Sequence, residues 1–181
     1  MGERTSWGTF LATHWEALAA ADSFTVEVLT LGGLVCSFVF FVIRLKPRTV
    51  EIAGITGQPT EAWMNPIART LTDSHNGFLR GMDHLVRDRD PLFTATFRRV
   101  LRDSEVKPLR WPARSPNVNA VAERFVLSIK SECSERMVLL GEAHLRTAAL
   151  HYLEHDHRKR PHQGLRNEVL VAHEKISRMG P

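Results

Sequence analysis

The sequence predicts an α/β fold in which a mixed sheet of about five strands is flanked by helices. Three segments in succession have the apolar or alternating pattern of β-strands, over residues 19–30, 34–43 and 48–56. After them, helical and strand-like segments alternate along the chain. This order is typical of a sheet covered by helices, and a chain of 181 residues is long enough for one core of that kind.

The first two strands are expected to form a hairpin about Gly32 and Gly33. Residues 28–43 carry no charge, which raises the alternative of a membrane segment. That run is shorter than the roughly 20 residues a spanning helix needs. Its central glycines and its Val, Thr and Phe content favour two buried strands, and a small membrane protein is the third-ranked interpretation.

The remaining elements follow from apolar spacing and turn signals. A helix is expected over residues 60–71, with Thr60 as its N-cap and a kink at Pro66. The later elements are a strand at 84–87, a helix at 94–104, an extended piece at 106–111, a helix after the turn "PARSPN", and a long amphipathic helix at 141–160. We therefore divide the chain into a lead-in or linker (1–18), a core (19–165) and a tail (166–181).

Composition narrows the class of protein. Hydrophobic residues make up 43% and charged residues 24%, as in globular proteins, and the net charge of +4 favours a polyanionic partner without identifying one. Cys36 and Cys133 are the only cysteines, too few for a disulfide framework or a cysteine zinc site. We expect a reducing, cytoplasmic setting without a secretory signal or a membrane partner.

Three carboxylates are candidates for chemistry. Asp88 follows a short strand, Asp22 lies among alanines in the first strand, and Glu123 lies on the polar side of a helix. Carboxylates from two strands and one helix are what a pair of Mg²⁺ ions requires for in-line displacement at phosphorus. Taken singly, each has a structural alternative: an Asx turn or helix cap for Asp88, a hydrogen-bonded buried group for Asp22, and a solvated carboxylate for Glu123.

Four segments together resemble the DDE transposases and retroviral-type integrases, whose catalytic core has a ribonuclease-H-like fold. They are "AAADSFTVEV", "RDRDPLF", "SPNVNAVAERFVLSIKSEC" and "HRKRPHQGL". Asp88 and Glu123 have 34 residues between them, close to the family spacing, and Phe93 stands five positions after Asp88 as in the family. The match assigns Asp88 to the metal-binding aspartate, whereas Asp90 falls where a glycine is common and is expected to shape the turn.

The resemblance implies a function. Asp22, Asp88 and Glu123 would hold two Mg²⁺ ions, with Mn²⁺ as a substitute, and would carry out phosphodiester cleavage and strand transfer in DNA transposition or integration. The implied partners are DNA, as element ends and target, and further copies of the chain. The implied location is the bacterial cytoplasm, at the nucleoid.

Several polar residues are candidates for contact with DNA, and each has a plainer alternative. They are Asn119, Lys130, Arg158, Arg160 and His162. A solvated helix end or face explains them as well as phosphate contact does. The histidines at 151, 155, 157 and 162 also raise the alternative of a zinc site, for which a basic helix end supplies little fixed geometry.

The chain departs from the family pattern at a few positions. Arg44 and Lys46 stand where many relatives have an acidic residue and a loop, and Pro66 and Pro108 fall inside elements that should be regular. The second-ranked function is therefore a catalytically inactive remnant that keeps the fold and binds DNA or other subunits.

Overall fold

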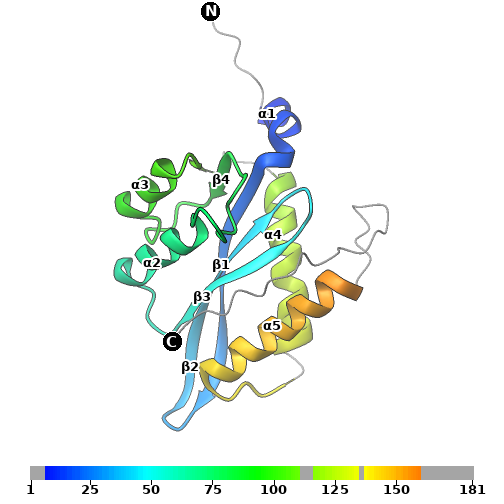
Figure 1. Cartoon of the computed structure of the whole chain (residues 1–181). Coiled ribbons are helices and arrows are strands. Elements are labelled where there is room, and N and C mark those ends of the chain that lie inside the picture. The colour runs from blue at the N-terminus through cyan, green and yellow to red at the C-terminus, as the bar shows by residue number, and fades with distance from the viewer. Residues whose placement is uncertain (1–6, 111–115, 135–136, 160–181) are drawn as a thin grey trace, which may run out of the picture.

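The computed structural model describes residues 7–110, 116–134 and 137–159, and at its centre lies a five-stranded mixed sheet (Figure 1). The strands are β1 (Leu18–Thr30), β2 (Gly33–Arg44), β3 (Val50–Thr56), β4 (His84–Arg87) and β5 (Lys107–Arg110). Their order across the sheet is β3-β2-β1-β4-β5. The first three are antiparallel neighbours, whereas β4 runs parallel to β1 and β5 parallel to β4. The predicted fold class is confirmed.

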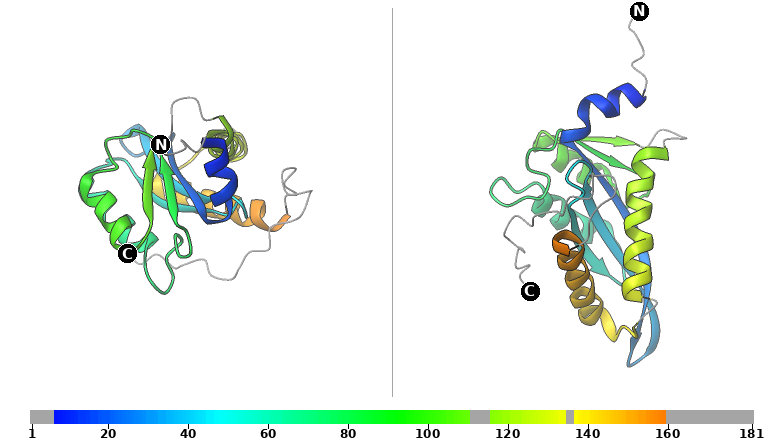
Figure 2. Two further views of the ribbon diagram at one scale, coloured as in Figure 1. Left: turned by 90° about the horizontal axis from the view of Figure 1, so that it is seen from above. Right: turned by 90° about the vertical axis from the view of Figure 1, so that its right-hand side faces the viewer.

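Helices cover both faces of the sheet (Figure 2). On one face lie α2 (Glu61–Leu71) and α3 (Ala95–Asp103), and on the other lie α4 (Pro116–Ile129) and α5 (Gly141–Lys159). The lead-in forms α1 (Trp7–His14) and the short 3-10 helix η1 (Trp15–Ala17), and α4 continues into the π-helical turn η2 (Lys130–Ser134).

The two sides of β1 belong to separate hydrophobic cores. Ala19 and Ala21 pack on the α2 and α3 side, whereas Ala20 and Phe24 pack on the α4 and α5 side. Successive side chains of a strand point to opposite faces, so an alternating assignment is what a central strand should show. By this alternation Asp22 belongs to the face that α4 covers.

Local signals place the helix ends. The Thr60 hydroxyl accepts a hydrogen bond from the Trp63 amide and caps α2, and Thr94 caps α3 in the same way through the Phe97 amide. α2 continues through Pro66 as one helix to Leu71. Its close approach to the sheet requires Gly54, because a Cβ there would lie 2.5 Å from the Trp63 ring.

The β1–β2 hairpin is only half buried, which corrects the expectation of two buried strands. The part of β2 near Phe41 lies in the core, whereas Leu31, Leu34 and Val35 at the tip are 112%, 68% and 45% exposed. β3 pairs with β2 only from Phe38 onward, so the tip extends beyond the sheet. Within the described residues, no helix combines the length and the apolar character needed to cross a membrane.

The departures from the family pattern are accommodated locally. Arg44 donates from Nε and Nη2 to the Phe78 carbonyl oxygen, at 2.9 and 2.6 Å, and stacks on the Phe78 ring. Lys46 forms an ion pair with Glu16. Pro108 lies in β5 at the edge of the sheet, where a missing backbone donor is tolerated.

Candidate functional site

The strand register brings Asp22 and Asp88 to neighbouring positions. In the parallel β1–β4 pair, Ala20 is opposite Val86 and Ala21 is opposite Arg87. Asp22 is the next residue of β1 beyond this ladder, and Asp88 is the first residue after the end of β4. If the alternation of side chains continues for one residue past β4, both carboxylates belong to the α4 side.

Glu123 reaches the same edge of the sheet from α4. Among the described side chains of that helix, those of Ala122, Phe125 and Ile129 are buried, and they belong to the same hydrophobic core as β1. The Phe125 ring lies 4.7 Å from the Phe41 ring between their centroids. This packing fixes the rotation of α4, and Glu123 lies on its exposed side next to the buried Ala122.

Electrostatics indicate that the carboxylates are close together. Burial raises the pKa of Asp22 above its usual value, while a hydrogen bond from the Ser23 amide, 2.8 Å long, lowers it. The negative charges of Asp88, Glu123 and Asp90 each raise the same pKa further by repulsion. The other two carboxylates predicted from the sequence therefore both lie near enough to Asp22 to affect its charge.

Asp88 and Asp90 both shape the turn after β4. Asp88 Oδ1 accepts the Asp90 amide at 2.9 Å, and Asp90 Oδ1 accepts the Leu92 amide at 2.8 Å. Two consecutive Asx-type turns hold this segment. The turn role expected of Asp90 is thus present, and Asp88 performs a similar role with one of its two carboxylate oxygens.

The donor set suits a hard divalent cation in its chemistry. It consists of carboxylate oxygens, which Mg²⁺ prefers, and a cation between them would offset the repulsion acting on Asp22. Among residues 7–110, 116–134 and 137–159, however, no group of three or more His, Cys, Asp or Glu side chains is arranged to hold a metal ion.

The candidate DNA contacts have different outcomes. Lys130 is half-buried, and its ammonium group lies 5.7 Å from the centroid of the Phe24 ring, two residues along β1 from Asp22. Asn119 and Arg158 lie in helices, but their side chains are outside the described part of the structure. Arg160 and His162 fall wholly outside the described residues, so their roles stay predictions.

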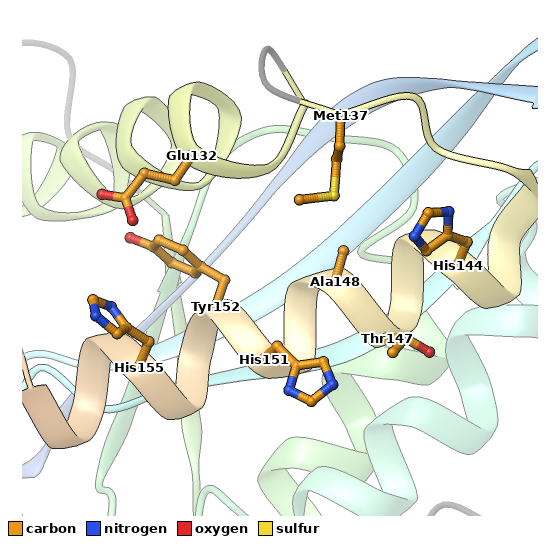
Figure 3. A pocket seen from close by; sticks show the side chains of 8 residues that line it. All are labelled: Glu132, Met137, His144, Thr147, Ala148, His151, Tyr152 and His155. Carbon is orange, nitrogen blue, oxygen red and sulfur yellow. The ribbon is translucent and has the colours of Figure 1, made fainter.

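Three of the four histidines of α5 line an open groove of about 360 Å³, which does not include the candidate carboxylates (Figure 3). Its lining includes His144, His151 and His155, with Tyr152 pointing toward Glu132. His157 is separate from this group, since its Nε2 accepts the Val50 amide at 3.0 Å.

A group of arginines on the other face of the same sheet edge was missed by sequence reasoning. Arg87 is 3% exposed, and burial lowers its pKa, as do the positive charges of Arg98, Arg110 and Arg102, whereas the Asp88 charge acts in the opposite direction. Arg87 is the last residue of the short buried strand β4, so its position in the sequence already suggests a buried cation. The arginines around Arg87 come from segments that are distant in the sequence, so no local pattern predicts that they lie together.

Comparison with solved structures shows that this architecture is similar to that of retroviral integrase catalytic cores. The catalytic core domain of BIV integrase matches with a TM-score of 0.58 and 17% identity, over 82% of this chain and 88% of that one. The chain has an integrase-core fold. The HTLV-2 integrase catalytic core in complex with magnesium, in its dimeric form, matches with a TM-score of 0.57 and 11% identity, over 80% of this chain and 88% of that one.

A larger assembly also contains this fold. The simian T-cell lymphotropic virus intasome, in complex with a PP2A regulatory subunit, matches with a TM-score of 0.55 and 12% identity, over 80% of this chain and 49% of that one. The chain matches no protein-family model and no curated protein sequence. At these identities, the comparisons establish the fold, and any activity has to be argued from the residues.

Proposed function

We propose that this chain is the catalytic core of a DDE-type transposase or integrase, a metal-dependent polynucleotidyl transferase. The observation that supports the proposal is the electrostatic effect of two carboxylates, those of Asp88 and Glu123, on a third, that of Asp22. They come from two strands and a helix, and the charges of Asp88 and Glu123 both act on Asp22. The integrase-core fold supports this assignment, as do the sequence segments around the three residues.

The three carboxylates would hold two Mg²⁺ ions, with Mn²⁺ as a substitute. When bound, these ions supply activation of an attacking oxygen and stabilisation of the leaving oxygen at a phosphodiester. The chain's own task is positioning. The turn hydrogen bond to Asp88 and the core packing of α4 anchor the segments that carry two of the three groups, and the side chains would turn toward the ions when these bind.

The proposed substrate and partners are DNA, as element ends and target, and further copies of this chain. HTLV-2 integrase cores of the same fold have been seen in dimeric and trimeric forms. The bacterial nucleoid is the proposed location, and residues 19–165 are the proposed catalytic core. The alternative, an inactive remnant that binds DNA or other subunits, differs in that it does not need the divalent ion.

A matched pair of substitutions tests the catalytic assignment. In both Asp88→Asn and Asp90→Asn, the amide oxygen can still accept the turn hydrogen bond, and each removes one negative charge. We expect Mg²⁺-dependent cleavage of DNA that contains element ends to fall by roughly three orders of magnitude or more in Asp88→Asn. Asp90→Asn should reduce activity only modestly, because its role is in the turn.

Both variants are compared over the same Mg²⁺ titration, with circular dichroism to establish that each is folded. If Asp90→Asn is inactive and Asp88→Asn is active, the metal-binding aspartate is Asp90. If both cleave DNA like the parent chain, neither aspartate holds the ion and the proposed site is wrong. A parent chain that binds DNA but never cleaves it would establish the remnant.

A further inference from the structure

Two arginines occupy directly opposed positions on the neighbouring strands β4 and β5. In the parallel β4–β5 pair, Arg87 is directly opposite Arg110 in the last row of the ladder. Like charges in directly opposed positions of a sheet are unfavourable unless an anion or a carboxylate lies between them. Because the row is shared, both side chains belong to the same face, and the Arg87 guanidinium marks that face by lying over the Phe93 ring of the α2 and α3 core.

The helix above this row adds two more cations. Arg98 and Arg102 are one turn apart on α3, which packs against β5. The register places Arg87 opposite Arg110, and the packing of α3 on β5 brings Arg98 and Arg102 to the same face, so the four guanidinium groups form one cluster. Burial is the main cause of the lowered pKa of Arg87, and the three neighbouring positive charges lower it further. The remaining arginine of α3, Arg99, is exposed and is not among the charges that lower the pKa of Arg87.

The base of the cluster is a buried guanidinium with incomplete hydrogen bonding. Arg87 Nη1 donates to the Asp88 carbonyl oxygen at 3.0 Å, but its Nε is buried and has no hydrogen-bond partner. Across the described part of the chain, no ion pair joins any of the four arginines to a carboxylate. Arg87 is therefore a buried cation without a directly paired counter-ion, which an anion would stabilise, while Arg102 and Arg110 are exposed and accessible to such an anion.

We propose that Arg87, Arg98, Arg102 and Arg110 form a binding site for a phosphodiester group of the DNA backbone. Guanidinium groups present paired N–H donors that match phosphate oxygens, and several of them around one phosphate neutralise its charge. The ligand chemistry follows from the cluster itself. Its identification as DNA rather than a small phosphate rests on the proposed function.

The position of the cluster defines what it would do. Arg87 and Asp88 are consecutive, so the cluster and the carboxylates lie on opposite faces of the sheet, near the carboxyl end of β4. DNA that crosses this edge would have one phosphate held on the α3 side while another segment lies at Asp22 and Asp88. The cluster is therefore a positioning site that fixes the path of the DNA, separate from the carboxylates that carry the chemistry.

The test compares two double variants of equal charge. Arg98→Gln with Arg102→Gln removes the α3 half of the cluster and leaves the buried Arg87 untouched. Arg69→Gln with Arg99→Gln removes two exposed charges from α2 and α3, outside the cluster. Binding of a 30-base-pair duplex is followed by fluorescence anisotropy in EDTA over a range of KCl concentrations, so that no metal contributes.

We expect the cluster variant to bind DNA roughly tenfold or more weakly, and its salt slope to be smaller by about one for each phosphate that it no longer neutralises. The control variant should change much less. A second probe is inorganic phosphate at constant ionic strength, which should raise the Tm of the parent chain and of the control but not that of the cluster variant.

Equal DNA binding and equal phosphate stabilisation in the two double variants would overturn the site. Loss of phosphate stabilisation with unchanged DNA binding would overturn the DNA assignment and leave a small-anion site. The EDTA conditions separate this inference from the proposed function: a chain that never cleaves DNA but shows the expected binding difference refutes the activity and supports the cluster.

Discussion

Glu51 on β3 shows how burial alone can make a single residue sensitive to pH. Its carboxylate is largely removed from water, and this burial raises its pKa to about 7, although the positive charge of Arg44 acts in the opposite direction. Arg44 itself is held by the Phe78 carbonyl and ring rather than by an ion pair with Glu51. Arg44 and Glu51 therefore interact through their charges without forming an ion pair. The Glu51 carboxylate is readily protonated in the folded chain.

The free energy of unfolding should consequently decrease as pH rises above 4.5, the ordinary pKa of a glutamate side chain. The folded chain holds the Glu51 proton more tightly than the unfolded chain, whose carboxyl pKa is near 4.5. The stabilising contribution is complete below that value and is lost as pH rises through about 7. The total change is at most about 3 kcal/mol by linkage.

Urea unfolding between pH 4.5 and 8 measures this effect. Glu51→Gln should remove this part of the pH dependence, whereas Glu27→Gln, at an exposed position of β1, should keep it. An unchanged profile in Glu51→Gln would assign the pH dependence to other groups.

Among the elements, α4 determines where the third carboxylate lies. The ring of Phe125 packs against the rings of Phe41 and Tyr152, with centroids 4.7 and 6.1 Å away. Through these contacts α4 is tied to β2 beneath it and to α5 beside it. Leu127, two residues further along the same helix, is 71% exposed and makes no such contribution to the core.

Phe125→Ala should destabilise the chain by about 3 to 5 kcal/mol, since a buried ring is replaced by a cavity. Leu127→Ala should change the free energy of unfolding by less than about 0.5 kcal/mol. Urea unfolding monitored by circular dichroism measures both. Similar losses in the two variants would mean that α4 does not pack on the sheet through Phe125.

At the scale of the whole molecule, charges of opposite sign lie on opposite faces of the sheet near the carboxyl end of β4. Carboxylates lie on the α4 side and arginines on the α3 side, while the chain as a whole carries a net charge of +4. The proposed role of these arginines is to hold phosphates of the DNA backbone. A cluster that binds phosphates reads no base edges, so binding through it carries little sequence information.

DNA affinity should therefore fall steeply with salt and differ little between unrelated duplexes of equal length. Each phosphate neutralised adds about one to the slope of log affinity against log salt concentration. Anisotropy titrations of several duplexes between 50 and 200 mM KCl measure both properties. A strong preference for one sequence at physiological salt would contradict backbone-dominated binding.

The accuracy of the sequence predictions depends on how local each feature is. The cap at Thr60, the hairpin between β1 and β2 and the strand at 84–87 were recognisable because each depends on a few adjacent residues. The hairpin turn itself is made by Leu31 and Gly32, one residue before the predicted pair of glycines. The exposure of Leu34 and Val35 was not, because burial depends on whether a third strand and a helix reach that far.

The sequence by itself determined the alternation of strands and helices and the three candidate carboxylates. Apolar periodicity and turn chemistry are encoded over a few residues, and the motif segments are contiguous. Only the tertiary structure decided that β1 and β4 pair directly before Asp22 and Asp88 and that Arg87 is opposite Arg110. Parallel strands are joined through long crossovers, so their register is set by the packing of the whole core and not by any residue near the pair.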